Sequence, residues 1–427
     1  MNGPRRLLAA LLVAVTGAAA SSVLGAPSQA HGSRGDRDPA VVERWSAIAT
    51  RTVVAENSVR PPVSALYTAF ASLAVHDAVV AVEGGFEPYA DRPRARRGSS
   101  SEAAAATAAY EVLRHYFPSS ADALKKDYDA ELAGVDEGLA GGVRVGRAAA
   151  ATLVELRADD GRGDTTVTVP TGDEPGEWVA TTPGVGMYAP WLGHVDPLVI
   201  DDVDRFELAG PPALRSRQYA RELEEVRTYG ARDGSARTPA QTGTAMFWTV
   251  NPIAQLQRAT GDLAARRELD IAETARAFAI LDSSVADALI VAWREKLEHP
   301  FWRPETAIPR ADTDGNRRTT ADPDWTPLTA SPPYPEYPSG HATVVGASTE
   351  ALAEVFGRRR LVVNVPSFVE TTPARRYESL RELDEEAMDA RIWQGIHFRT
   401  AMEDANELGH EVGDWVADHR FGPTRRH

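Results

Sequence analysis

Residues 335–343 read PEYPSGHAT and stand directly before a run rich in Ala and Val. Pro338 can end a loop, Ser339 can cap a helix, and Gly340 lets the backbone approach a ligand closely. His341 follows at once, where its imidazole can exchange a proton with a group bound at the helix N-terminus. The stretch therefore predicts a helix that begins beside a bound anion. An ordinary capped helix is the alternative for these residues taken alone.

The chain has 427 residues, enough for a large core, and an ordinary globular composition. It contains no cysteine, so its stability must come from the packed core and not from disulfides. The formal net charge of -15 argues against nucleic acid or an anionic membrane surface as a partner. We also expect no stable membrane insertion. An anion site on such a chain must be a local cluster of positive charge.

The first thirty residues have the layout of a secretory signal. They run from Arg5 and Arg6 through an apolar stretch to small residues, and the apolar part is too short for a comfortable membrane span. We therefore expect a signal peptide at residues 1–30, a disordered leader at residues 31–40 and a secreted, extracellular mature protein.

Apolar residues at spacings of three and four dominate the rest of the chain and predict an all-α fold. Helices are expected at residues 41–57, 64–83, 102–117, 120–134, 141–157, 212–229, 262–281, 284–298, 341–357, 377–391 and 399–420. Strand-like alternation is confined to short pieces such as residues 165–169. We expect two helical bundles packed into one globule, an N-terminal half at residues 41–250 and a C-terminal half at residues 251–423. Long loops of the second half, such as residues 304–340, should roof the site.

Two further segments carry side chains that suit an oxyanion. Lys296 and Arg303 lie in KLEHPFWRP, and they offer a point charge and a planar fork for two oxygens. Arg391 and His397 lie in RIWQGIH and add a second guanidinium and a second imidazole. Each pair has an ordinary explanation when taken singly, since cations are favoured at helix C-termini and most histidines are surface or satisfied core residues.

Together and in this order, Lys-x6-Arg-Pro, Pro-Ser-Gly-His and Arg-x5-His resemble the signature of a known superfamily. It joins vanadium-dependent haloperoxidases to type 2 phosphatidic acid phosphatases and bacterial acid phosphatases. DALIVAWREKLEHPFWRP at residues 287–304 and RIWQGIHFRTA at residues 391–401 resemble the haloperoxidase branch. Residues 60–84 resemble the first half of bacterial secreted haloperoxidase-like proteins, and the likeness extends loosely over residues 41–420.

The resemblance implies vanadate as the cofactor and a role for each site residue. His397 would bind vanadium, or attack phosphorus if the bound anion is a phosphate ester. His341 would be the acid/base, and Lys296 would also polarise bound peroxide. The oxyanion oxygens would be held by Lys296, Arg303, Ser339, the Gly340 amide and Arg391. Substrates would be halide, hydrogen peroxide and an organic acceptor; the oligomeric state stays open, with a homodimer as one option.

One position departs from the pattern of many relatives, which carry an Asp four residues after the last His, where it can fix the imidazole tautomer. This chain has Ala401 there, and Glu403 should face away from His397 on a regular helix. A main-chain carbonyl, a water or a carboxylate from elsewhere is then expected to orient His397. Because a nucleophilic His needs raised basicity, the absence of this Asp weighs somewhat against a phosphatase.

Three functions are compatible with these residues. The preferred one is a vanadate-dependent haloperoxidase, which oxidises halide with hydrogen peroxide to a hypohalous-acid equivalent. The alternative is a phosphate-ester hydrolase that works through phospho-His397, with His341 protonating the leaving group. A non-catalytic anion-binding relative is the third, and only Ala401 supports it. A homologue of the haloperoxidases that rearranges a carbon skeleton without oxidising halide also stays open.

Overall fold

The computed structural model describes residues 38–90, 93–181 and 184–424. The chain divides into a unit at Met1–Asp36 and a compact unit at Arg37–His427, and only the second is described below. The predicted signal peptide at residues 1–30 lies outside the described residues, as does most of the predicted leader. The first helix already begins at Ala40, where the backbone N–H donates to the Asp38 carboxylate at 3.0 Å.

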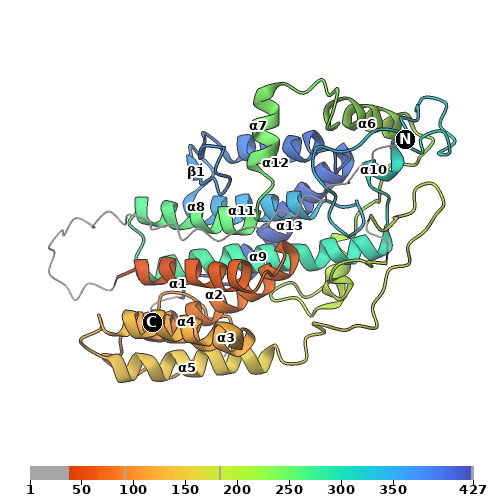
Figure 1. Cartoon of the computed structure of the whole chain (residues 1–427). Helices are drawn as coiled ribbons and strands as arrows, with labels where there is room; N and C mark the ends of the chain where they lie inside the picture. The colour runs from red at the N-terminus through yellow and green to blue at the C-terminus, as the bar shows by residue number, and fades with distance from the viewer. Residues whose placement is uncertain (1–37, 91–92, 182–183, 425–427) are drawn as a thin grey trace, which may run out of the picture. The chain divides into compact units, whose positions relative to one another are not determined.

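The described residues are mostly helical, and the all-α prediction is confirmed (Figure 1). The N-terminal helices are α1 (Ala40–Thr50), which continues into a π-helical turn at Arg51–Glu56, α2 (Pro61–Glu83), α3 (Ser101–Tyr116), α4 (Ala121–Leu132) and α5 (Leu139–Leu156). The later helices are α6 (Arg217–Tyr229), α7 (Pro239–Phe247), α8 (Pro252–Arg266), α9 (Ile271–Glu298), α10 (Pro304–Ala307), α11 (Gly340–Phe356), α12 (Leu380–Trp393) and α13 (Arg399–His419). Within the described ranges the strands are β1 (Val363–Val365) and β2 (Arg375–Tyr377), an antiparallel pair.

Three predictions of local structure are wrong. Residues 165–169 form no strand, and α7 with most of α8 covers residues that the apolar spacing did not assign to a helix. The break expected at residues 282–283 does not exist, because the polar groups there are satisfied inside the helix bundle. The Ser283 hydroxyl donates to the Ala279 carbonyl at 2.5 Å, and the Asp282 carboxylate accepts from Gln257 at 2.8 Å.

The actual break lies between α8 and α9, where a capping box starts the longer helix. The Asp270 carboxylate accepts from the Glu273 N–H at 2.8 Å, and the Glu273 carboxylate accepts from the Asp270 N–H at 2.9 Å. These reciprocal bonds satisfy backbone donors that the first helical turn leaves free. The next 28 residues, Ile271–Glu298, then form one helix that ends at the predicted cationic segment.

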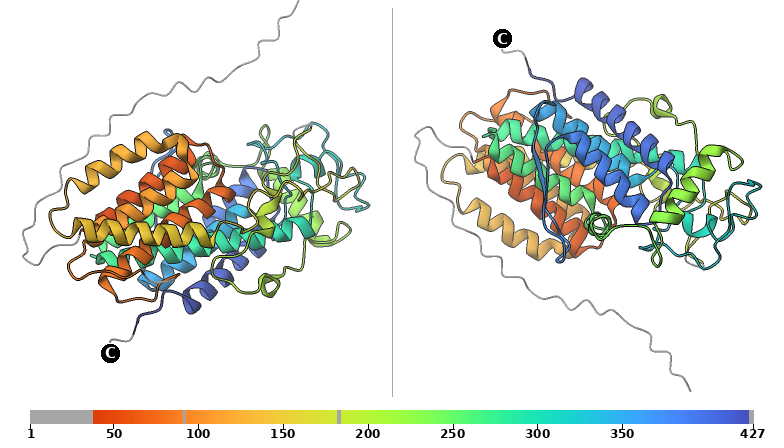
Figure 2. Two further views of the ribbon diagram at one scale, coloured as in Figure 1. Left: turned by 90° about the horizontal axis from the view of Figure 1, so that it is seen from below. Right: turned by 90° about the horizontal axis from the view of Figure 1, so that it is seen from above.

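Helix α9 joins two groups of helices. The first group is α1 to α5, in which α3 packs on both α2 and α5, and the second contains α11, α12 and α13. Helix α9 contacts α2 on one side and α11 with α13 on another, and Figure 2 shows the same arrangement from below and above. Helix α2 is the one helix among the described residues that is long and apolar enough to cross a membrane, but 89% of its apolar window is buried inside the protein. That burial suits a core helix.

Long irregular segments are tied to these helices by buried polar contacts. The Asp287 carboxylate on α9 accepts from the backbone N–H groups of Leu198, Val199 and Ile200 at 2.6, 2.8 and 3.0 Å. The Ser339 N–H donates to the Ala401 carbonyl at 2.9 Å, so the start of α11 is fixed to the first turn of α13. The second contact holds the predicted segment around Ser339 beside the predicted segment that contains His397.

A cationic histidine joins α11, α12 and α13 behind the site. His410 Nδ1 lies 2.9 Å from the Glu350 carboxylate and Nε2 lies 3.1 Å from the Asp384 carboxylate. Burial alone lowers the pKa of His410, but the hydrogen bonds with Asp384 and Glu350 outweigh it and raise the pKa to about 9. Both ring nitrogens then donate, and the imidazolium neutralises part of the two carboxylates.

We predict that His410→Gln lowers the free energy of unfolding at pH 6 by about 1–3 kcal/mol. Because the folded pKa is raised, the stabilisation is fully present below the unfolded pKa of about 6.5 and is lost as the pH rises through about 9. Urea unfolding at pH 6, 8 and 10 should show the two proteins converging. His419→Gln, at the exposed end of the same helix, is the matched control, and an equal effect there would contradict the prediction.

Candidate oxyanion-binding site

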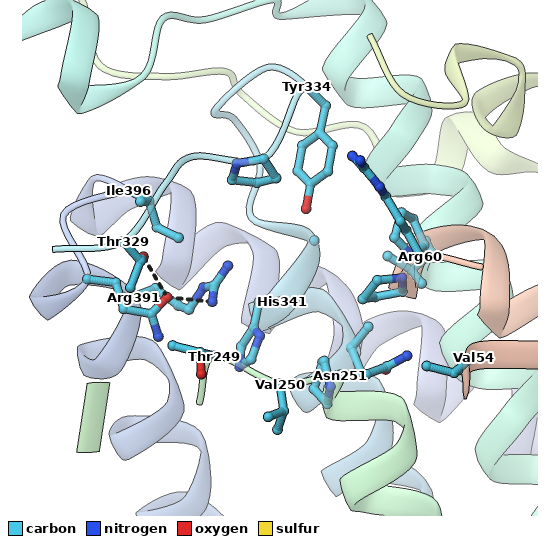
Figure 3. Close-up of a pocket in the computed structure, with 18 of the residues that line it drawn as sticks. Val54, Arg60, Thr249, Val250, Asn251, Thr329, Tyr334, His341, Arg391 and Ile396 are labelled. Carbon is cyan, nitrogen blue, oxygen red and sulfur yellow. Dashed lines mark hydrogen bonds between the residues drawn. The ribbon is translucent and has the colours of Figure 1, made fainter. Parts of the chain in front are cut away.

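A cavity of about 500 Å³ opens at the N-terminus of α11. Gly340, His341 and Arg391 line it, and Figure 3 shows the His341 and Arg391 side chains on the same side of it. The other predicted site residues do not line the cavity and lie buried beside these three, each at most 1% exposed: Lys296, Arg303, Ser339 and His397. The structure therefore brings all seven residues together from α9, α11, α12 and the adjoining loops.

Lys296 and Arg303 are held by carbonyl oxygens of the proline-rich loop before α11. Lys296 Nζ donates to the carbonyls of Pro335 at 2.8 Å, Glu336 at 3.3 Å, and Pro338. Arg303 donates to the carbonyls of Tyr334 at 3.1 Å, Pro335 at 3.3 Å and Ile396 at 2.7 Å. The three ammonium donors of Lys296 are all in use. For Lys296 to contact an anion, the anion must therefore replace one of these carbonyls as acceptor. The Glu336 carbonyl, at 3.3 Å from Nζ, forms the weakest of the three bonds.

Lys296, Arg303 and Arg391 together form a cationic cage. Keeping its positive charge away from water destabilises the folded protein. Burial, and then Arg303, lower the pKa of Lys296 well below its ordinary value. Burial lowers the pKa of the partly buried Arg391 to about 10. The ring of Tyr334 lies 5.2 Å from Lys296 Nζ and 5.1 Å from Arg303 Cζ and offsets part of this cost through its π face. A bound anion would offset much more.

His397 is oriented by Glu336, a carboxylate within the stretch PEYPSGHAT. His397 Nδ1 lies 2.9 Å from Glu336 Oε1, and the Phe398 N–H donates to the same oxygen at 2.9 Å. His397 Nε2 lies 3.1 Å from Arg303 Nη1. Because a guanidinium only donates, Nε2 must be the acceptor and Nδ1 must carry the proton. Because Ala401 cannot orient His397, we expected a main-chain carbonyl, a water or a carboxylate from elsewhere to do so. The structure shows a carboxylate, that of Glu336.

Burial keeps the two imidazoles neutral. It lowers the pKa of His397 well below its ordinary value, with Arg303 as the next cause, and it raises the pKa of Glu336 to about 8, against the pull of Arg303. Burial and Arg391 also lower the pKa of His341 far below its ordinary range. A neutral His397 offers its Nε2 lone pair to a metal or to phosphorus, and a neutral His341 can take up a proton.

Two buried nitrogens at the cavity have no hydrogen-bond partner among the described residues, His341 Nε2 and Arg391 Nε. The neighbouring nitrogen Nη1 of Arg391 donates to Gln394 Oε1 at 2.7 Å (Figure 3) and also to the Trp248 carbonyl at 3.3 Å, which holds the guanidinium in place. Buried polar atoms without partners are rare in folded proteins and are costly unless a ligand satisfies them. One nitrogen is a donor and the other is an acid/base, as an oxyanion with exchangeable protons requires.

The start of α11 adds neutral donors. The Ser339 oxygen caps the helix by accepting from the Ala342 N–H at 3.4 Å, which leaves its own O–H free to donate. The Gly340 N–H belongs to the first residue of α11 and therefore has no acceptor within the helix. A Cβ at Gly340 would lie 2.9 Å from the Trp293 ring, so only glycine fits between this ring and the cavity. Among the described residues no three His, Cys, Asp or Glu side chains form a cation site.

The comparisons with known proteins agree with this geometry. Residues 276–422 match the family model of the VCPO second helical-bundle domain. The vanadium chloroperoxidase of Curvularia inaequalis is 28% identical over 292 residues, which are 52% of this chain and 47% of that protein. The chain thus spans about half the length of this curated relative. Both matches are to vanadium-dependent haloperoxidases, the branch that the sequence resembles.

Two solved structures have the same fold. The crystal structure of a bacterial vanadium-dependent iodoperoxidase has a TM-score of 0.76 at 24% identity and covers 91% of this chain and 98% of its own. The holo-type bacterial vanadium-dependent chloroperoxidase has a TM-score of 0.71 at 19% identity and covers 90% of this chain and 97% of its own. At these identities the likeness establishes the arrangement of helices.

We predict that Glu336→Leu weakens orthovanadate binding by roughly 10–100-fold, because His397 then loses the acceptor that fixes its tautomer. Glu336→Gln keeps an oxygen acceptor at the same place and should remain within a few-fold of the unaltered protein. Titration calorimetry measures both affinities, and circular dichroism verifies that both variants are folded. Equal affinities for the Leu and Gln variants would contradict the assignment of Glu336.

Proposed function

We propose that this chain belongs to the superfamily of vanadium-dependent haloperoxidases and type 2 phosphatidic acid phosphatases and is a vanadate-dependent haloperoxidase. The reaction is X⁻ + H₂O₂ + H⁺ → HOX + H₂O, followed by HOX + RH → RX + H₂O on an organic acceptor. Halide loses two electrons and peroxide gains them. The observation that carries the proposal is the buried cationic cage around a tautomerically fixed His397.

The residues present fit vanadate. His397 Nε2 is the candidate ligand for vanadium, and the oxygens would be held by Arg303, Arg391, the Ser339 hydroxyl and the Gly340 N–H, with Lys296 adding charge. The partnerless Arg391 Nε and His341 Nε2 are two atoms that such an anion would satisfy. When bound, vanadate supplies Lewis-acid activation of hydrogen peroxide. Cations and neutral donors stabilise the anion without donating electrons to the metal.

The chain's own residues supply the proton transfer and the electrostatics. His341 is neutral at pH 7 and holds a free Nε2 at the cavity, where it can take a proton from hydrogen peroxide and return it to the leaving oxygen. The cationic cage compensates negative charge that develops on oxygen during the transfer. The rings of Tyr334 and Trp293 line the cavity and lie 5.2 and 5.4 Å from Lys296 Nζ, and such apolar surroundings strengthen these interactions.

A phosphate-ester hydrolase remains the second candidate because of Glu336. The expectation that Ala401 weighs against a phosphatase assumed that His397 lacks a basic partner. Glu336 Oε1 at 2.9 Å from Nδ1 is such a partner, and it would support a nucleophilic His397 as well as a metal-bound one. The cage alone therefore supports both chemistries, and the similarity to the vanadium chloroperoxidase of Curvularia inaequalis supports the haloperoxidase as the first candidate.

Extracellular action belongs to the same proposal. It rests on the layout of residues 1–30, with charge, apolar stretch and small residues in the order of a secretory signal. Halide, hydrogen peroxide and an organic acceptor are the proposed substrates.

A two-armed assay tests the function. We predict that the mature protein loaded with orthovanadate brominates an activated 1,3-diketone in the presence of bromide and hydrogen peroxide, and that the metal-free protein does not. The second arm follows hydrolysis of an aryl phosphate. Hydrolysis that orthovanadate inhibits, without halogenation, would replace the first proposal by the second. Bound vanadate with neither reaction would favour the non-catalytic relative.

Two histidine variants test the roles. We predict that His341→Ala keeps its affinity for orthovanadate within a few-fold but lowers turnover by about 10²–10⁴-fold, because the proton acceptor is lost. His397→Ala should bind orthovanadate poorly, because it loses the imidazole that would bind vanadium. Calorimetry and the halogenation assay on both variants give the comparison, and the reverse pattern would overturn the role assignment.

A further inference from the structure

The cavity beside His341 is lined by positive charge in an otherwise acidic protein. The chain carries a formal net charge of -15, yet none of the described residues that line the cavity is Asp or Glu. Its titratable lining consists of Arg60, Tyr334, His341 and Arg391. A cavity of this composition attracts anions and repels cations, because the fields of its arginines are not compensated locally.

The remaining lining is mostly apolar. It combines prolines with aliphatic and aromatic side chains, among them Val54, Leu289, Trp293 and Val344. Trp293 is fully buried, and its indole N–H donates to the Tyr188 carbonyl at 3.3 Å, so the ring is fixed. A cavity of about 500 Å³ is much larger than halide or hydrogen peroxide needs, and its size and walls suit an organic molecule.

Arg60 is an unpaired cation at the entrance of this cavity. It is the N-cap of α2 and precedes Pro61 and Pro62, which restrict its backbone to the extended conformation observed. Its guanidinium carbon lies 5.1 Å from the centre of the Tyr188 ring. No ion pair joins Arg60 to a described residue, whereas the exposed Arg44 of the neighbouring α1 pairs with Asp38 and Glu131. Figure 3 shows Arg60 across the cavity from Arg391.

We propose that this cavity binds an anionic aromatic acceptor, with its carboxylate on Arg60 and its ring against the apolar wall near Trp293. The inference rests on the proposed function, because it assigns the organic substrate class of the same site. Arg60 has free donors for a carboxylate, and its stacking on Tyr188 lowers the entropy that it loses on binding. Arg391 belongs to the oxyanion cage, so Arg60 is the cation available to the acceptor.

The test compares two probes that differ only in charge, 4-hydroxyphenylacetate and the neutral 4-hydroxyphenylacetamide. Calorimetry is done without peroxide, and the cage is first saturated with orthovanadate, or with phosphate if vanadate does not bind. The acetate should bind at least about tenfold more tightly than the amide, as expected for one charge-assisted contact. Arg60→Gln should abolish this preference, and Arg60→Lys should keep part of it.

Arg267→Gln, an exposed arginine outside the cavity, is the matched control and should keep the full preference. An equal affinity for both probes, no binding of either, or a preference unchanged in Arg60→Gln would each overturn the inference. Because binding is measured without turnover, Arg60-dependent binding in an inactive protein would refute the haloperoxidase alone. Full activity without Arg60 dependence would refute the acceptor site alone.

Discussion

The structure of the site depends on one constraint: positive charge must be kept out of bulk water with a single buried carboxyl group, Glu336, as a partial counter-ion. Lys296 and Arg303 are fully buried and Arg391 is partly buried. An unpaired buried charge costs several kcal/mol even after relaxation, about the net stability of a small domain. The protein meets this cost mainly with main-chain carbonyls, which are dipoles, and the Glu336 carboxyl group compensates the charge only in part. The cage is therefore prepared for an anion at the expense of folding, as electrostatic preorganisation requires.

The proline-rich loop before α11 is suited to this task because of its backbone chemistry. Prolines have carbonyls but no N–H groups, so a loop containing Pro335 and Pro338 presents an excess of acceptors. Lys296 and Arg303 use these acceptors, and in doing so they fix the loop. The same loop contributes Tyr334 to the cavity wall. A substitution that loosens the cage would consequently also alter the cavity.

The sequence was sufficient for the residues whose spacing is set by local structure. Lys296 lies in the last turn of α9, and His341 follows a helix cap, so both could be placed from their neighbours. Glu336 could not be assigned to His397, because the contact spans 61 residues and joins a loop to a loop without periodicity. The only feature of the sequence that could have indicated a role for Glu336 was its position between prolines and beside a cationic motif. The start of α9 was missed although Asp270 and Glu273 form the capping-box pattern, since the apolar spacing runs through both helices.

Glu336 also explains why the cage alone does not distinguish the two chemistries. Its main-chain carbonyl accepts from Lys296 and its carboxylate accepts from His397. One residue therefore helps to position the Lys296 ammonium and fixes the tautomer of His397. Either a vanadium-bound or a phosphorylated imidazole would gain from this. The distinction must then lie in what the cavity admits. Phosphoenzyme hydrolysis needs water beside His397, whereas an oxidised halogen must meet an organic acceptor before it escapes. Mostly apolar walls around an uncompensated Arg60 favour the second requirement over the first.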